Sequence, residues 1–216
     1  MDRAGIVGPD GPTHHGIFDI AFMRTLPDMI VTAPKDGNEL RNLLATALHS
    51  QKNFSIRYPK DSSRIFDLNS ESVVLEIGKW EILHKGITSV ILAVGSMVGM
   101  IIDNKDIIYK SLGYLPTIVN ARFIKPLDKE MLLTLCETHA SIITIEEGTL
   151  TGGFGSAVSD FLHDNNQTNN LSRLGIPDYF IQQGSRNELL QEVGLTVDNL
   201  ISAIDGQVKK QEVYEF

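Results

Sequence analysis

Short apolar runs rich in β-branched residues alternate along the chain with segments whose apolar residues recur every three or four positions. The runs are typical of buried strands, and the recurring segments are typical of amphipathic helices. Residues 90–95 show the first pattern most clearly, and residues 36–48 show the second. This alternation predicts an α/β fold built around a mostly parallel sheet.

The expected elements divide into two units of unequal size. Residues 1–58 hold two strands and two helices, which is a thin basis for an independent α/β core. Residues 59–76 are polar and lack a helical period, so we interpret them as a linker. Residues 77–216 hold about five strands and four helices and have the make-up of a complete domain with a mostly parallel five-stranded sheet.

Helix-start signals mark two of the expected helices. Asp36 and Glu39 stand at capping-box spacing, and so do Ser185 and Glu188. The helix after Asp36 would bury one apolar face. That face consists of Leu40, Leu43, Leu44, Ala47 and Leu48. Residues 97–112 keep a helical period throughout, and we expect them to form one helix that a glycine ends.

The charge balance excludes several classes of function. The 216 residues include 27 acidic and 19 basic side chains, which gives a net charge of −8. This acidic balance argues against a nucleic-acid partner and against attraction to anionic membranes. No run reaches the roughly 18–20 apolar residues that span a bilayer, and the polar N-terminus is unlike a signal peptide. A single cysteine, Cys136, excludes an internal disulfide and indicates a reducing compartment.

The densest polar cluster lies in residues 10–16, which include Asp10, Thr13, His14 and His15 among glycines. Two histidines near aspartates could bind a metal, but no third ligand stands at a recognised spacing. A second interpretation is a solvated surface loop, which composition alone favours. The third is an active-site loop, in which glycines allow close backbone approach and a histidine transfers a proton or contacts an oxyanion.

Two further groups of charged residues follow expected strands. Arg57 and Lys60 stand at the end of a strand, where an open α/β sheet binds ligands, although a surface charge pair beside a linker is the simpler interpretation. Glu146 and Glu147 precede a glycine-rich turn at 152–157 that opens a helix. Helix N–H groups can hold an anion, but two glutamates would repel a phosphate, so we favour a structural role there.

Residues 2–16, with the sequence DRAGIVGPDGPTHHG, resemble the signature segment of the 1-deoxy-D-xylulose-5-phosphate synthase family. The shorter DGPTH at 10–14 is shared more widely among transketolase-like thiamine diphosphate enzymes. The resemblance continues along almost the whole sequence. Further matching segments are MIVTAPKD (29–36), RYPK (57–60), RFIKPLD (122–128), EEG (146–148), GGFGS (152–156) and LGIPDYFI (174–181). The combination of DRAG and the late LGIPD is specific to the synthase family.

This resemblance implies three α/β domains in the family, of which the chain resembles only the later part. The first domain binds the diphosphate and Mg²⁺ through a Gly-Asp-Gly motif, which this sequence lacks. Residues 1–58 resemble the C-terminal part of the domain that binds the aminopyrimidine, and residues 77–216 resemble the C-terminal domain. We therefore expect a C-terminal fragment that contains neither cofactor-binding nor metal-binding residues and is inactive alone.

The resemblance also implies a reaction. Family members use thiamine diphosphate and Mg²⁺ to condense pyruvate with glyceraldehyde 3-phosphate, with loss of CO₂, for isoprenoid, thiamine and pyridoxal biosynthesis. By motif position, Arg3 and Lys60 resemble the two residues that hold the substrate phosphate, although the family usually has arginine at the second position. Asp10 and His14 resemble the catalytic pair that contacts substrate hydroxyl and carbonyl oxygens. The resemblance further implies a homodimer in the cytoplasm or in a plastid-type organelle.

Two alternatives stay open. One is a β-subunit-like part of a 2-oxo-acid dehydrogenase, which the DRAG segment and the missing activating glutamate disfavour. The other is a non-catalytic dimerisation or regulatory module. With the family's first domain missing, apolar surface in residues 1–58 would be uncovered, and we expect self-association or disorder there.

Overall fold

The structure is a computed structural model that describes residues 1, 3–63 and 65–206. Asp2 of the signature segment and residues 207–216 of the expected second unit lie outside this description. In the described part of the chain, no helix has both the length and the apolar character needed to cross a lipid bilayer.

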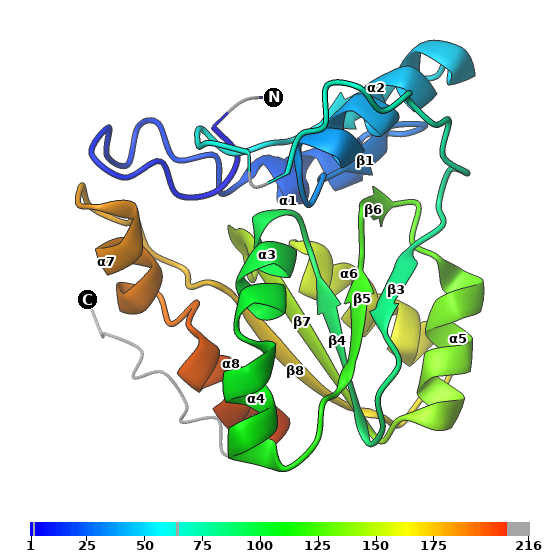
Figure 1. The fold of residues 1–216 in the computed structure, drawn as a ribbon, viewed down its shortest axis with the longest axis vertical. Helices are drawn as coiled ribbons and strands as arrows, with labels where there is room; N and C mark the ends of the chain where they lie inside the picture. The colour runs from blue at the N-terminus through cyan, green and yellow to red at the C-terminus, as the bar shows by residue number, and fades with distance from the viewer. Residues whose placement is uncertain (2, 64, 207–216) are drawn as a thin grey trace.

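A five-stranded sheet forms the centre of the C-terminal part of the chain (Figure 1). Its strands are β3 (Glu81–His84), β4 (Ser89–Ala93), β5 (Thr117–Asn120), β7 (Ser141–Thr149) and β8 (Asn170–Ile176). Their spatial order is β3-β5-β4-β7-β8. The strand β3 runs antiparallel to β5, and the other neighbours are parallel. The predicted mostly parallel α/β sheet is therefore confirmed.

Helices cover both faces of this sheet. On one face lie α3 (Ser96–Asp103), α4 (Lys105–Leu112) and α8 (Val197–Ile204), and on the other lie α5 (Lys129–Thr138) and α6 (Phe154–Asp164). Successive side chains of β4 point to opposite faces, so the strand contributes alternately to the two cores. Burial on both sides explains why this strand reads as a continuous apolar run.

The single helix expected over 97–112 is wrong, because the chain forms two helices separated by Asn104. The Asn104 backbone has φ −110° and ψ 16°, outside the helical region. Its side-chain amide donates to the Met100 carbonyl at 2.8 Å, and its N–H donates to the Ile101 carbonyl at 3.1 Å. A side chain that bonds to nearby backbone groups competes with the helix. The apolar period runs through the break and does not reveal it.

The N-terminal part contains α1 (Asp19–Thr25), β1 (Ile30–Thr32), α2 (Gly37–Ser50) and β2 (Phe54–Ile56). Its sheet has the order β2-β1-β6, in which β6 (Phe123–Lys125) comes from the C-terminal part of the chain. The strands β1 and β2 are parallel, whereas β1 and β6 are antiparallel. A strand of the second unit thus adds to the small sheet of the first, and the two units share hydrogen bonds.

The helix α2 presents much of its expected apolar face to solvent. Leu43 is fully buried, but Leu44 is 53% exposed and Leu48 is 75% exposed. Phe22 of α1 is also 50% exposed. Apolar surface in residues 1–58 is therefore uncovered, as expected, although the burial of α2 differs from the prediction.

The segment 59–76 runs along α2 without forming a helix or strand in its described residues. The Val73 N–H donates to Asn42 Oδ1 at 3.0 Å, and the Leu75 N–H donates to Thr46 Oγ1 at 2.8 Å. The two acceptors stand four residues apart on one face of α2, which matches one helical turn. Side chains of α2 thus accept hydrogen bonds from backbone N–H groups of the segment that connects the two parts.

The N-terminal part lies across the carboxyl ends of the parallel strands (Figure 1). The Ala33 N–H donates to the Arg122 carbonyl, just beyond β5, at 3.0 Å. At the end of β7, the Thr149 N–H donates to the Ile17 carbonyl at 2.8 Å. This is the edge at which open α/β sheets bind their ligands. The fold therefore places the glycine-rich loop of residues 3–16 beside a functional edge.

Candidate functional site

Residues 3–16 form a loop that is closed at its base by two backbone hydrogen bonds. The Gly5 N–H donates to the Gly16 carbonyl at 2.8 Å, and the Gly16 N–H donates back to Gly5 at 2.9 Å. The Ala4 N–H also donates to the Tyr58 carbonyl at 2.9 Å. These bonds bring the start of the loop next to the segment that follows β2.

Asp10 lies near the basic residues that the sequence singled out. Lys60 Nζ donates to Asp10 Oδ2 at 2.8 Å. This hydrogen bond lowers the pKa of Asp10 below its ordinary value, and the positive charges of Lys60, Arg3 and His14 act in the same direction against the effect of burial. The structure therefore joins Lys60 directly to the partly exposed Asp10, and it places Arg3 and His14 near enough for their charges to act on the same carboxylate.

The Asp10–Lys60 ion pair leaves Lys60 able to bind a second group. Both side chains are substantially exposed, and exposed pairs are weakly held. A lysine ammonium has three N–H donors, of which Asp10 takes one. The remaining N–H donors of Lys60 are therefore left for a further hydrogen-bond acceptor.

His14 is held within the loop, and Arg3 has an unusual backbone conformation. The His14 N–H donates to the Gly11 carbonyl at 3.0 Å, and its ring Nδ1 lies 3.0 Å from Thr13 Oγ1. Arg3 has φ 60°, in the left-handed region. For a residue other than glycine this conformation costs roughly 1–2 kcal/mol. Strained residues of this kind cluster at functional sites, where surrounding contacts hold them in place.

His15, which the resemblance left without a role, is a buried part of the loop. Its Nδ1 accepts the Val7 N–H at 3.0 Å, and its Nε2 lies 3.4 Å from the Gln182 carbonyl. These partners fit a neutral ring with the proton on Nε2. Because both nitrogens are engaged, His15 is unsuited to join His14 in a metal site. Because the two histidines are adjacent in sequence, no sequence pattern indicated that His15 is buried and His14 is exposed.

Arg57 does not share the surface with Lys60, although both belong to the RYPK segment. Arg57 is buried, and its Nε donates to Asp19 Oδ2 at 2.8 Å. Its Nη2 donates to the carbonyls of Gly16 at 3.1 Å and Glu147 at 3.0 Å. Arg57 therefore ties together the end of the loop, α1 and β7, and has a structural role.

Glu146 occupies the anion-binding end of α6. Its Oε2 accepts the Phe154 N–H at 2.8 Å, and its Oε1 accepts the Gly155 N–H at 2.7 Å. Burial raises the pKa of Glu146 above its ordinary value, and these two hydrogen bonds oppose the effect. The carboxylate fills the place that a phosphate would take at this helix start. The structural interpretation of the EEG segment is therefore supported for Glu146.

Glu147, the next residue, contacts the loop instead. Its Oε2 accepts the Ile6 N–H at 3.0 Å, and its Oε1 accepts the Ser96 hydroxyl at 2.6 Å. Arg186 of α7 (Arg186–Glu192) forms an ion pair with the same carboxylate. The sequence singled out Glu147 together with Glu146, but no local pattern indicated its contact with the loop, because its partners are far away in sequence.

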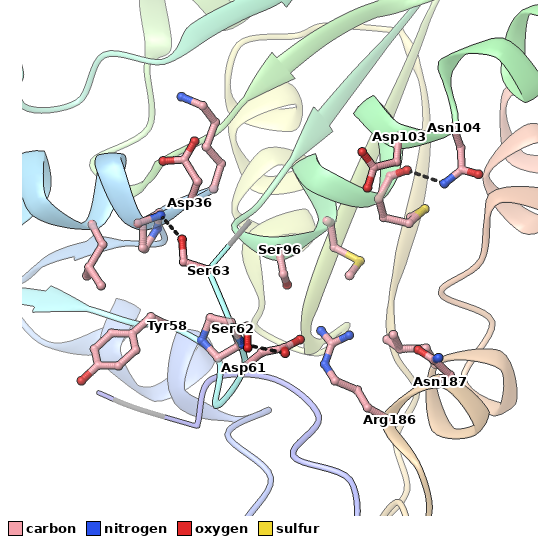
Figure 2. A pocket seen from close by; sticks show the side chains of 18 residues that line it. Asp36, Tyr58, Asp61, Ser62, Ser63, Ser96, Asp103, Asn104, Arg186 and Asn187 are labelled. Carbon is pink, nitrogen blue, oxygen red and sulfur yellow. Dashed lines mark hydrogen bonds between the residues drawn. The ribbon is translucent and has the colours of Figure 1, made fainter. Parts of the chain in front are cut away.

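A cavity of about 470 Å³ opens between the segment after β2 and the helices α3 and α7. Figure 2 shows Asp61 and Ser62 on one side of it, and Ser96 and Arg186 on the other. None of the four sequence-predicted residues lines this cavity. Among the described residues, no group of three or more histidine, cysteine, aspartate or glutamate side chains could hold a metal ion.

Family models match both parts of the chain. The model of the transketolase pyrimidine-binding domain matches residues 1–65, and the model of the transketolase C-terminal domain matches residues 78–200. Among solved structures, one described as "Split gene transketolase, inactive beta4 tetramer" has a TM-score of 0.78 and 25% identity over 91% of this chain and 62% of that one. A transketolase from Campylobacter jejuni has a TM-score of 0.71 over 95% of this chain and 30% of its own, and at 19% identity it supports the fold alone.

Curated relatives narrow the similarity. A 1-deoxy-D-xylulose-5-phosphate synthase from Heliobacterium modesticaldum is 42% identical over 93% of this chain, and one from Aquifex aeolicus is 41% identical over 97%. The matches cover 31% and 33% of those proteins, so the chain spans about a third of their length. On these matches the chain belongs to the transketolase family, and the curated proteins it is similar to are 1-deoxy-D-xylulose-5-phosphate synthases.

Proposed function

We propose that the chain supplies the C-terminal domain and part of the pyrimidine-binding domain of a 1-deoxy-D-xylulose-5-phosphate synthase. The proposed reaction condenses pyruvate with glyceraldehyde 3-phosphate and releases CO₂. The observation that carries the proposal is the hydrogen bond from Lys60 to Asp10 of the signature loop, with Arg3 and His14 of the same loop near enough for their charges to act on that carboxylate. Identity of about 40% to synthases over nearly the whole chain supports it.

In this proposal Arg3 and Lys60 bind the phosphate of the aldehyde substrate. A phosphate dianion needs fixed cations, and charge-assisted hydrogen bonds to it are stronger than neutral ones. Arg3 can offer two parallel donors to the phosphate, whereas Lys60 acts as a point charge. The lysine that replaces the usual arginine of the family keeps the charge but loses the planar fork.

Asp10 and His14 contact the reacting end of the same substrate. With its pKa lowered, Asp10 is ionised near neutral pH and accepts a hydrogen bond from a substrate hydroxyl. His14 has no hydrogen bond at Nε2 among the described residues, so this nitrogen can donate to a carbonyl oxygen. A donor at that position stabilises the negative charge that develops on the oxygen.

Thiamine diphosphate supplies the carbanion chemistry of this family when it is bound. We propose that this chain does not supply the site for its diphosphate and Mg²⁺. The described residues hold no cluster of three metal-binding side chains, and the sequence lacks the Gly-Asp-Gly motif. We therefore assign no cofactor-binding or metal-binding residue here and propose that the 216 residues alone do not turn over substrate.

Two measurements on the 216-residue chain test this function. Calorimetric titration should show binding of glyceraldehyde 3-phosphate and much weaker binding of glyceraldehyde, since the phosphate carries the affinity. An assay with pyruvate, glyceraldehyde 3-phosphate, thiamine diphosphate and Mg²⁺ should yield no product. Equal binding of the two aldehydes would contradict the phosphate site, and steady turnover would contradict the proposed inactivity.

A second candidate function is a non-catalytic association module. The exposed side chains of Phe22, Leu44 and Leu48 favour contact with another protein surface. A structural neighbour is described as an inactive tetramer of one split-gene chain, which supports self-association here, including the homodimer that the family resemblance implies. Sedimentation of the chain as a concentration-independent monomer would contradict this function.

A further inference from the structure

We infer that Glu147 is a positioning residue for the proposed substrate loop. This inference rests on the proposed function, because it gives Glu147 the task of holding the loop that carries Asp10 and His14. Its carboxylate lies in the C-terminal part of the chain, whereas the loop belongs to the N-terminal part. The C-terminal domain thereby sets the geometry of a substrate site whose four proposed residues all precede it in the sequence.

The bond to the loop is well placed to fix it. Glu147 is 2% exposed, and its Oε2 accepts the Ile6 N–H at 3.0 Å. Ile6 is adjacent to Gly5, one of the two residues whose paired hydrogen bonds close the loop. A side chain on Gly5 would overlap the Glu147 carboxylate, so the backbone approaches that carboxylate as closely as glycine allows. Movement of Glu147 would therefore move the base of the loop.

The other carboxylate oxygen is itself held from two directions. Glu147 Oε1 accepts the Ser96 hydroxyl at 2.6 Å and pairs with the Arg186 guanidinium. Ser96 begins α3 and Arg186 begins α7, so two helices of the C-terminal part fix one rotamer of Glu147. Hydrogen bonds to a charged acceptor are roughly twice as strong as neutral ones. The network is thus pre-organised before a substrate binds.

Glu146 offers a matched comparison on the same strand. It is as deeply buried as Glu147, but successive residues of a strand point to opposite faces. Its two carboxylate oxygens accept hydrogen bonds from the start of α6, and among the described residues neither oxygen bonds to the loop. Replacing Glu146 measures the effect of losing a buried carboxylate from the core. Replacing Glu147 measures the same effect together with the loss of the contact that holds the loop.

The experiment compares E146Q, E147Q and the unmodified 216-residue chain. We expect E147Q to weaken binding of glyceraldehyde 3-phosphate by about tenfold, the lower end of what loss of a charged hydrogen bond produces. We expect E146Q to change this binding by less than about twofold. We expect it to lower thermal stability about as much as E147Q does. Equal losses in the two variants, or unchanged binding in E147Q, would overturn the inference.

Hydrogen exchange of the Ile6 and Gly16 amides separates this inference from the proposed function. If the unmodified chain binds no glyceraldehyde 3-phosphate, the proposed function fails, and exchange then decides the role of Glu147. We expect exchange about tenfold faster at both amides in E147Q and unchanged in E146Q. If either glutamine variant does not fold, S96A, which removes one donor to Glu147, must give a smaller shift in the same direction. Unchanged exchange in S96A and E147Q would overturn the inference.

Discussion

Arg57 Nε donates to Asp19 Oδ2 at 2.8 Å, and both side chains are buried at the point where the two parts of the chain meet. Neither residue reaches the candidate site, yet Arg57 also donates to the carbonyl of Glu147 and to the carbonyl that ends the glycine-rich loop. One guanidinium therefore joins α1, the loop and β7. We therefore expect the geometry of the site to depend on this buried contact between Arg57 and Asp19.

Replacement of Arg57 by alanine should destabilise the fold severely. The change leaves the Asp19 carboxylate buried without its partner, and breaking a buried pair in this way costs about 3–5 kcal/mol. Urea unfolding followed by circular dichroism measures the loss. The matched control is Glu130→Ala, which removes the exposed partner of Lys79 and should cost far less. Similar losses of unfolding free energy in the two variants would contradict the structural role of Arg57.

Replacement of Arg3 by alanine should weaken binding of glyceraldehyde 3-phosphate without unfolding the chain. Loss of one charged hydrogen-bonding partner of a phosphate reduces affinity by roughly tenfold to a hundredfold. Calorimetric titration gives the affinity, and His163→Ala, at the far end of α6, serves as the control. If both variants lose affinity equally, Arg3 is not a phosphate ligand.

Glu81 should give the chain extra stability that is lost in acid. Burial raises the pKa of Glu81, but hydrogen bonds from Lys35 and Asn120 and the charges of Lys35 and Arg122 outweigh it, so the pKa lies below the ordinary 4.5. In the unfolded chain the group binds a proton at higher pH. The unfolded state therefore holds more protons below about pH 5, and stability rises with pH through this range.

The Glu81→Gln variant tests this dependence. We expect its unfolding free energy to rise less steeply with pH between about pH 3 and pH 6 than that of the unmodified chain. Glu146, whose pKa is shifted in the opposite direction, is present in both proteins, so its contribution cancels in the comparison. Urea melts across this range measure the difference. Parallel curves would show that Glu81 has the same pKa in the folded and unfolded states.

The spacing of apolar residues predicted most of the fold, because the side that a strand or helix buries determines where its apolar residues stand. The strand β4 is apolar throughout since helices cover both of its sides, and Ser185 does start α7 with the predicted capping box. The break at Asn104 could not be predicted from the apolar period, which continues through it. The pairing of β6 with β1 joins segments far apart in sequence, which no local pattern reports.

The candidate site likewise contains residues that the sequence identified and a contact that it did not. Arg3, Asp10, His14 and Lys60 were chosen by motif, and the structure groups them, while their roles stay predictions. The partners of Glu147 are set by tertiary contacts alone, so sequence reasoning could not identify its contact with the loop.

Two leucines of α2 should behave in opposite ways on mutation. Leu43 is fully buried, and its truncation to alanine should cost about 2–5 kcal/mol of unfolding free energy because it leaves a cavity. Leu48 is 75% exposed, so Leu48→Glu should change stability by no more than about 0.5 kcal/mol. If the uncovered face of α2 drives self-association, the same variant should shift the chain toward monomer. Urea unfolding and sedimentation velocity of both variants measure these effects. An oligomer that persists unchanged in Leu48→Glu would place the self-association surface away from this end of α2.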